Sequence, residues 1–180
     1  MDKYVIKKPR ISVNFVPTPT PTPTLTLNPT PNPSVESDTD TIVSDPGSRK
    51  QIKEYDVGIR DRIRREYISK GVCQPFGHNF PKTTYGKSTR TFRDKWFKKY
   101  DWLEYSISKD AVFCFYCFLF KPDNMIHFGD DAFTKVGFKN WKNACEKLRD
   151  HVGEIGSPHH NARILYEGFK WRYLKKLTKM

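Results

Sequence analysis

The chain has 180 residues, with 32 Lys and Arg against 20 Asp and Glu, and a net charge of +12. No apolar run approaches the roughly 18 residues of a membrane span, and the N-terminus lacks the apolar segment of a secretory signal. We therefore expect an intracellular protein without a membrane partner. Residues 1–48 hold 4 basic and 5 acidic side chains, which leaves 28 and 15, a net +13, for residues 49–180. That surplus indicates a polyanionic partner, most simply nucleic acid.

The first 48 residues predict an extended arm without a core. Pro and Thr alternate from Pro17 onward, and prolines recur as far as Pro33. Alternating prolines remove backbone donors and favour extended conformations. The basic cluster Lys7-Lys8-Pro9-Arg10 is a solvated stretch or, alternatively, a nuclear import signal or a phosphate-contacting arm. We place a disordered Pro/Thr-rich arm at 1–48 and one folded domain at 49–180.

Two basic segments follow the arm. Apolar residues spaced by four predict a helix over 56–70 that Gly71 ends, and a second helix over 89–100. The aromatic residues of the second segment are either core or platforms on which bases stack. The basic side chains beside the apolar residues of these two predicted helices either form a solvated face or contact phosphates. The candidate nucleic-acid-binding residues are Arg60, Arg62, Arg64, Arg65, Arg90, Arg93, Lys95, Lys98 and Lys99.

The segment between these helices, 71–88, has almost no periodicity. Its Cys73 and His78 could in principle hold a metal, but no second pair of ligands lies nearby. After the second helix, strands over 102–106 and 111–113 flank a polar turn and predict a β-hairpin. Phe118-Leu119-Phe120 continues as a buried strand or turn.

The predicted hairpin delivers two cysteines, Cys114 and Cys117, to one place. A Cys-x2-Cys turn brings two thiolates together, and structural zinc binds four nitrogen or sulfur ligands. Intracellular thiols are normally reduced, so a metal is favoured over a disulfide. The alternative is a pair of core cysteines with surface histidines elsewhere.

The second half of the site is expected more than thirty residues later. A helix over 138–150 ends at His151, and Ser157-Pro158 is a good start for a last helix that runs to about residue 177, with His159 in its first turn. The sequence thus predicts a Zn²⁺ site of Cys114, Cys117, His151 and His159, with His160 as the rival fourth ligand. Four protein ligands leave no position for a catalytic water, so the site would be structural.

The sequence also predicts which residues of the last two helices face the core. Cys145 should be a small buried hydrophobe beside Trp141 and Leu148. In the last helix we expect four residues to face inward: Ala162, Leu165, Phe169 and Tyr173.

From about Tyr67 to Arg163 the chain resembles the TTF-type zinc finger of hAT-superfamily transposases and their domesticated relatives, including zinc finger MYM-type protein 1-like proteins. The matching pieces are Gly71-Val72-Cys73-Gln74-Pro75, His78-Asn79-Phe80-Pro81, Trp96-Phe97-Lys98-Lys99-Tyr100, Trp102-Leu103-Glu104-Tyr105-Ser106, Phe113-Cys114-Phe115-Tyr116-Cys117 with Leu119-Phe120, Gly137-Phe138-Lys139-Asn140-Trp141, and His151-Val152-Gly153 with His159. The resemblance implies DNA binding at transposon ends or a chromatin role in the nucleus, with the same four zinc ligands.

In that family the finger precedes an RNase H-like catalytic domain, for which the residues after the finger leave no room. We therefore expect no transposase catalysis, no other enzyme activity and no small-molecule substrate. The predicted fold is α+β, a small zinc-stapled domain with a β-hairpin and three to four helices after a disordered arm. The predicted function is a DNA-binding module. The alternative is a protein-interaction module that docks a transposase or chromatin protein.

Overall fold

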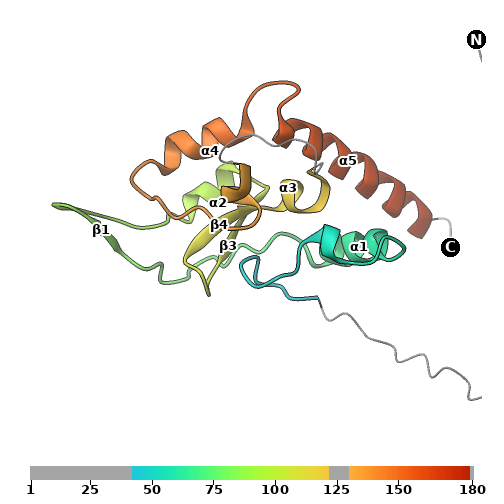
Figure 1. Cartoon of the computed structure of the whole chain (residues 1–180), viewed down its shortest axis with the longest axis horizontal. Coiled ribbons are helices and arrows are strands. Elements are labelled where there is room, and N and C mark those ends of the chain that lie inside the picture. The colour runs from blue at the N-terminus through green and yellow to red at the C-terminus, as the bar shows by residue number, and fades with distance from the viewer. Residues whose placement is uncertain (1–41, 122–129, 179–180) are drawn as a thin grey trace, which may run out of the picture. The chain divides into compact units, whose positions relative to one another are not determined.

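The computed structural model describes residues 42–121 and 130–178 (Figure 1). Most of the predicted arm, residues 1–41, lies outside the described residues, and its disorder stays a prediction. Residues 42–48, which the sequence assigned to the arm, contact the folded unit. Ile42 is buried, and the Asp45 carboxylate accepts a hydrogen bond from the backbone of Ser108 at 3.1 Å.

The described residues are mixed α and β, which confirms the predicted fold class. They include a second hairpin and more helices than the sequence indicated. In chain order the elements are η1 (Ile52–Glu54), α1 (Arg60–Lys70), β1 (Thr83–Tyr85), β2 (Ser88–Arg90), α2 (Lys95–Lys99), β3 (Leu103–Ser106), β4 (Ala111–Cys114), α3 (Phe115–Phe120), η2 (Asp130–Phe133), α4 (Ala144–Val152) and α5 (Pro158–Leu177).

The predicted hairpin is confirmed as β3–β4, and it lies in the core because every residue of both strands is buried. Its two outer edges are also covered. On one side the backbone N–H of Tyr105 donates to the carbonyl of Cys73 at 3.0 Å. On the other side Val112 and Phe138 exchange two backbone hydrogen bonds of 2.8 and 2.9 Å. Because its strands are buried and hydrogen-bonded on both edges, the hairpin holds Cys114, the last residue of β4, in a fixed position.

The aromatic stripe of residues 92–100 belongs to the core, because Phe92, Trp96 and Tyr100 are all buried. The alternative that these rings stack on bases is therefore wrong. The predicted helix over 89–100 is also wrong, since only Lys95–Lys99 is helical. Phe92 precedes that helix and lies 5.2 Å from Trp96 and 5.0 Å from Tyr105, ring centroid to ring centroid. The four-residue spacing between Phe92 and Trp96 therefore does not indicate a helix, because Phe92 packs into the core from a loop.

Helix α1 ends at Gly71 as predicted, where φ is +82°, but it begins at Arg60 instead of residue 56. Below its buried face lies a buried ion pair between Arg49 and Glu104. The Arg49 guanidinium also lies 3.5 Å from the centroid of the Phe118 ring. Burial raises the pKa of Glu104, and Arg49 opposes that rise. Sequence reasoning missed this pair, because neither residue lies in an apolar pattern.

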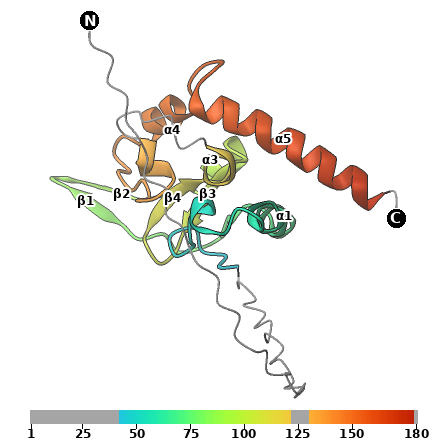
Figure 2. The ribbon, with the colours of Figure 1, turned by 45° about the vertical axis from the view of Figure 1, so that its right-hand side comes forward.

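The run after Cys114 is the helix α3, where the sequence predicted a strand or turn. All its residues are apolar, so periodicity could not distinguish the two structures. Helix α5 lies across α3 and reaches α1 (Figure 2). The rings of Tyr116 and Tyr166 stack at 4.4 Å between centroids, and Phe120 lies 5.3 Å from Phe169.

The predictions for the last two helices, α4 and α5, differ in accuracy. Helix α5 has the predicted bounds, but Leu165 is exposed and Tyr166 is buried in its place, so that part of the predicted face is wrong. Helix α4 begins at Ala144, six residues later than predicted, because the backbone of Phe138 pairs with β4. Cys145 consequently lies on the exposed face of α4, which corrects its predicted burial. Among the described helices, none combines the length and apolarity that a bilayer crossing would need.

Candidate metal centre

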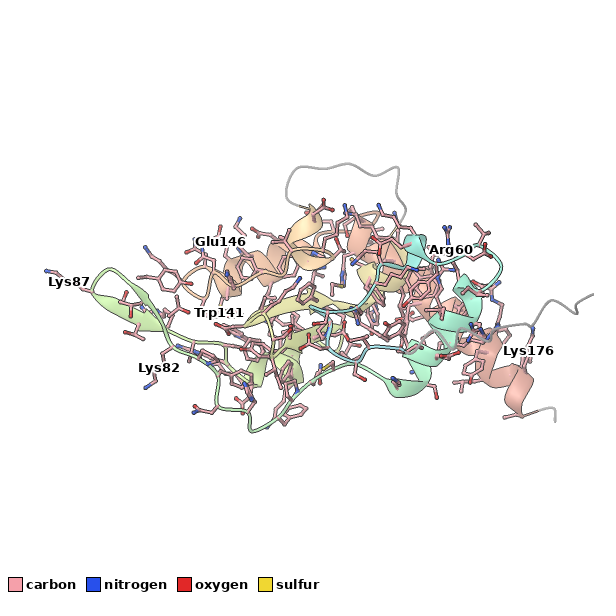
Figure 3. All side chains as sticks on the ribbon, turned by 60° about the horizontal axis from the view of Figure 1, so that its bottom comes forward. Arg60, Lys82, Lys87, Trp141, Glu146 and Lys176 are labelled. Atoms are coloured by element: carbon pink, nitrogen blue, oxygen red, sulfur yellow. The ribbon has the colours of Figure 1, made fainter. Side chains whose placement is uncertain are left out.

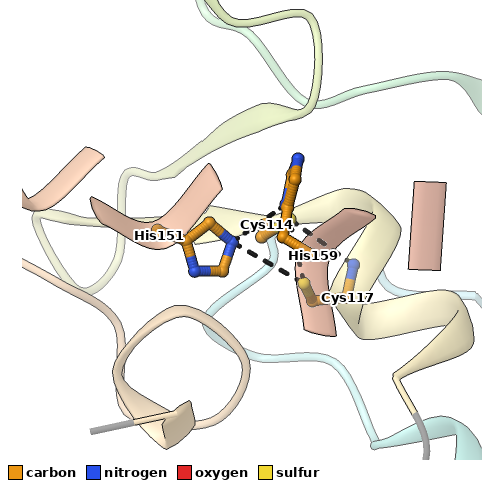
Figure 4. Close-up of side chains that lie close together, drawn as sticks. All are labelled: Cys114, Cys117, His151 and His159. Carbon is orange, nitrogen blue, oxygen red and sulfur yellow. Dashed lines mark hydrogen bonds between the residues drawn. The ribbon is translucent and has the colours of Figure 1, made fainter. Parts of the chain in front are cut away.

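Four side chains from three parts of the chain converge on one point: Cys114, Cys117, His151 and His159 (Figure 4). Each offers one ligand atom, and these atoms all lie within 4.8 Å of one another. The structure thus brings together the four residues that the sequence selected. This group could hold a metal ion.

The separations between the ligand atoms agree with tetrahedral geometry. Zinc bonds of about 2.3 Å to sulfur and about 2.05 Å to nitrogen place two nitrogens about 3.4 Å apart and a nitrogen about 3.6 Å from a sulfur. Nδ1 of His159 lies 3.1 Å from Nε2 of His151, 3.3 Å from Sγ of Cys114 and 3.7 Å from Sγ of Cys117. Cys117 Sγ lies 3.6 Å from Nε2 of His151. These four of the six separations match a tetrahedral zinc ion, and all six are within 4.8 Å. The donor set therefore suits a metal of zinc size.

The cysteines are fixed at the junction of β4 and α3. Cys114 ends the buried strand, and its Sγ accepts a hydrogen bond from the backbone N–H of Cys117 at 3.4 Å, which caps α3. The backbone N–H of Phe115 donates to the carbonyl of Trp102 at 2.9 Å and ties the junction to the neighbouring strand. The first turn of α3 then points the Cys117 sulfur back toward Cys114.

The histidines are brought together by the tight turn between α4 and α5. Gly153 ends α4 with φ +61°, and a Cβ added there would lie 2.8 Å from the Cβ of Ser157. The Ser157 hydroxyl donates to the carbonyl of Val152 at 2.8 Å and accepts from the backbone N–H of His160 at 3.1 Å. This arrangement caps both helix ends at once. It holds His151 and His159 on facing sides of the turn.

Aromatic rings surround the cluster. The Trp102 ring lies 5.0 Å from the ring of His151 and 4.9 Å from that of His159. The Phe133 ring lies 4.2 Å from His151. Both cysteines and His159 are buried, and His151 is half-buried. A metal ion here would be largely shielded from water, as in structural sites.

Hydrogen bonding changes the acidity of the two thiols in opposite directions. The Cys114 thiol, followed by the two histidines, lowers the pKa of Cys117 to about 3. Burial raises the pKa of Cys114, and its hydrogen bond to Cys117 adds to that rise. A dication binds cysteine sulfur as thiolate, so metal binding at this pair would be favoured by higher pH and would release any thiol proton.

The rival ligands lie elsewhere among the described residues. His160 follows His159 by one residue, its backbone N–H caps α5, and its ring is not among the clustered ligands. The Cys73 thiol donates to the carbonyl of Tyr105 at 3.7 Å, while the ring of His78 contacts Phe80. The described part of the chain therefore supports His159 as the fourth member of the group and gives no sign of a second metal pair.

The predicted nucleic-acid-binding residues fall into two groups, one on α1 and one on β2, α2 and the loop between them. Figure 3 shows Arg60, in the α1 group, on the side of the folded unit away from Lys87 at the tip of the β1–β2 hairpin. In the α1 group, Arg60 donates to two backbone carbonyls, those of Lys53 and Tyr55. Arg64 donates to the carbonyl of Leu119 and pairs with Asp61, and Arg62 pairs with Glu66. Arg65 is half-buried. Most of these guanidinium groups are therefore already bound within the domain.

The second group lies on β2, on α2 and in the loop between them. All of its members are exposed: Arg90, Arg93, Lys95, Lys98 and Lys99. The base of the β1–β2 hairpin lies next to α2, because the Phe92 ring lies 4.7 Å from the ring of Phe80 and 4.8 Å from that of Phe97 on α2, centroid to centroid. One acidic residue, Asp94, interrupts this stretch. Sequence analysis predicts these five residues on a single helix over 89–100, whereas the structure distributes them over β2, the following loop and α2.

Comparison with known families gives one partial match. Residues 131–173 match the family model described as ZMYM1/FAM200, RNase-like domain. The match contains His151 and His159, whereas both cysteines precede it, so it overlaps only the second half of the TTF-type resemblance. The RNase-like description therefore falls on residues that, as far as Arg163, the TTF-type resemblance assigns to the zinc finger. The chain matches no curated protein and no solved structure. The match supports a relation to the transposase-derived ZMYM1/FAM200 family.

Proposed function

We propose that this chain is a zinc-dependent DNA-binding module, derived from a hAT-type transposase and acting in the nucleus without transposase catalysis. One observation carries the metal part of this function: the four ligand atoms from β4–α3, α4 and α5 lie within 4.8 Å of one another, and four of their six separations match those of tetrahedral zinc. The family match to residues 131–173 supports the transposase origin.

Zinc is the metal that suits this donor set. Two thiolates and two imidazoles are soft and borderline ligands, and tetrahedral sulfur and nitrogen sites select zinc among the common metals of the cell. The four protein ligands fill a tetrahedral shell, so Cys114, Cys117, His151 and His159 would hold the ion in a structural site. The ion would join the β3–β4 hairpin to the turn between α4 and α5, and its binding energy would contribute to folding.

DNA as the partner is supported by charge. Residues 49–180 carry a net +13, as counted above, and one set of exposed cations lies on β2, α2 and the loop between them. Side chains of this kind bind phosphates and release counterions, which makes affinity fall steeply with salt. The α1 group contributes less to this proposal than the sequence suggested, because its guanidinium groups are engaged within the domain.

The test is the salt dependence of binding. The zinc-loaded full chain is titrated into a fluorescent mixed-sequence DNA duplex at several salt concentrations, and fluorescence anisotropy gives the affinity. We expect log affinity to fall linearly with log salt, with a slope of about −4 or steeper if at least five phosphates are contacted. Binding that is absent at low salt, or that does not change with salt, would remove DNA from the proposal.

A second candidate function is a protein-interaction module. Helix α5 exposes several large apolar side chains: Ile164, Leu165, Trp171 and Leu174. Such residues on one helix favour a protein partner, for example a transposase or a chromatin protein. Substitution of Trp171 by Ala separates the two functions, because it removes apolar surface and leaves the basic side chains of β2 and α2 intact. If DNA binding is the function, this variant keeps wild-type affinity for the duplex.

A further inference from the structure

We propose that the β1–β2 hairpin, residues 82–91, enters the major groove of duplex DNA. This inference rests on the proposed DNA-binding function and names the element that carries it. Sequence analysis missed the hairpin, because Thr83–Arg90 has no alternation of apolar and polar residues. In the structure it protrudes from the folded unit (Figure 1).

The hairpin is basic without acidic neighbours in the sequence. Residues 67–93 contain no Asp or Glu, and the cations of this stretch are Lys70, Lys82, Lys87, Arg90 and Arg93. Figure 3 shows Lys87 at the tip of the hairpin and Lys82 near its base. Lys82, Lys87 and Arg90 are all exposed. The hairpin therefore carries positive charge without neighbouring acidic residues in the sequence, and this charge is complementary to a polyanion.

The dimensions of the hairpin suit a groove. It has two antiparallel strands, and within the described residues both outer edges are unpaired, because the sheet contains only β1 and β2. Strands in such a ribbon lie about 4.8 Å apart. The major groove of B-DNA is about 12 Å wide and admits a two-stranded ribbon, whereas the minor groove, at about 6 Å, does not.

The two faces of the hairpin have different roles. On one face the Tyr85 hydroxyl donates to the carbonyl of Lys139 at 3.0 Å and accepts from the backbone N–H of Trp141 at 3.2 Å. These bonds attach that face to the domain. The opposite face carries the cross-strand pair Thr84 and Thr89, both exposed. The hairpin is therefore held in a fixed orientation with one face directed away from its support.

The chemistry of the exposed face fits base edges. A threonine hydroxyl donates to or accepts from the polar atoms of the major groove, and its methyl group contacts the thymine methyl. Thr84 and Thr89 would thus touch bases, while Lys82, Lys87 and Arg90 would contact the flanking phosphates. Phosphate contacts position a protein on the duplex, and base contacts give it sequence preference.

The first test removes the phosphate contacts. The triple variant Lys82→Gln/Lys87→Gln/Arg90→Gln is compared with a control of equal charge loss on α4 and α5, Arg149→Gln/Arg172→Gln/Lys176→Gln, on the same mixed-sequence duplex. We expect the hairpin variant to lose at least about tenfold in affinity and its salt slope to shrink by about 3, and the control to change less than about threefold. Equal effects of the two variants would overturn the inference.

The second test examines base contacts. Wild type and the near-isosteric variant Thr84→Val/Thr89→Val each select sequences from a random duplex pool. We expect the variant to lose or alter the selected sequence while its affinity for the mixed-sequence duplex stays within about threefold. Methylation of guanine N7, which lies in the major groove, should interfere with wild-type binding. An unchanged selected sequence, interference confined to minor-groove adenine N3, or preference for single strands would each overturn the inference.

The outcomes separate the two proposals. If wild type does not bind duplex DNA, both the function and the hairpin inference fail. If wild type binds with a steep salt slope and the hairpin variant binds equally well, only the inference fails. Zinc content and thermal unfolding monitor folding of each variant. Should the triple variant unfold, the single change Lys87→Gln at the exposed tip replaces it, with an expected decrease of about 1 in the salt slope.

Discussion

Nδ1 of His159 lies 3.1 Å from Nε2 of His151, although the two residues belong to different helices and are eight positions apart. Two nitrogen ligands of a tetrahedral zinc ion are about 3.4 Å apart, so the turn between α4 and α5 already sets the spacing that the metal needs. The junction of β4 and α3 supplies the two sulfurs, which lie 3.3 and 3.7 Å from Nδ1 of His159. The fold thus brings the four ligand atoms together, and each of its supports can be tested separately.

The two adjacent histidines give the first prediction. His159→Ala should lower the thermal stability strongly and reduce zinc affinity at least about a hundredfold, because it removes a ligand from a closed site. His160→Ala is the matched control, since its ring is outside the cluster. It should retain one zinc and melt within a few degrees of wild type. Equal zinc loss in both variants would contradict the assignment of His159.

The glycine that ends α4 gives the second prediction. Gly153 has φ +61° and ψ −160°, a conformation nearly restricted to glycine, and a Cβ there would also meet Ser157. Gly153→Ala should therefore destabilise the protein by about 1–3 kcal/mol and weaken zinc binding, because the two histidines separate. Gly156→Ala provides the comparison, since its φ is +86° but nothing lies within 4 Å of an added Cβ.

Denaturant unfolding and zinc competition with a chelator measure both glycine variants. We expect Gly153→Ala to be the more destabilising of the two and to bind zinc more weakly. If the two variants have the same stability and the same zinc affinity, contact with Ser157 does not position the histidines.

The third prediction concerns the buried ion pair of Arg49 and Glu104, whose side chains are each 1% exposed. Either single change, Arg49→Met or Glu104→Gln, leaves a buried group without its charged partner and should cost about 3–5 kcal/mol. The double variant should lose clearly less than the sum of the two single losses. Urea unfolding of all four proteins gives the coupling energy. Additive losses would show that the two side chains contribute independently.

The fourth prediction compares the two basic groups. Lys95→Gln/Lys98→Gln/Lys99→Gln on α2 should reduce the salt slope of DNA binding by about 3, because under the proposed function these exposed side chains would contact phosphates. Arg62→Gln/Arg65→Gln on α1 should change the slope by less than about 1. Arg64 is excluded from this variant because its bonds to Leu119 and Asp61 are structural. A larger effect of the α1 variant would reverse the assignment of the binding surface.

Strong local signals made part of the fold predictable from sequence. The β3–β4 hairpin was recognised from β-forming residues on both sides of a polar turn, and Ser157-Pro158 defined the start of α5. Cys-x2-Cys spacing and histidines at helix ends identified the four clustered residues. These features depend on neighbouring residues, so no tertiary information was needed.

The errors occurred where tertiary contacts overrode the local pattern. Phe138 was assigned to a helix, but its backbone pairs with Val112 and delays the start of α4. The same delay moved Cys145 to the exposed face. The β1–β2 hairpin depends on the hydrogen bonds of Tyr85 to the 139–141 loop, which no pattern in its own residues reveals. Tertiary contacts of this kind are not encoded in a short window of sequence.

The most direct test of this account is the thermal unfolding of the full chain before and after removal of metal. We predict one zinc per purified chain, and a midpoint that falls by more than about 10 °C when a chelator removes the ion, because the metal-binding energy is folding energy. The midpoint should recover when zinc is restored. A chain that contains no zinc, or that melts at the same temperature with and without the chelator, would contradict the metal centre formed by Cys114, Cys117, His151 and His159.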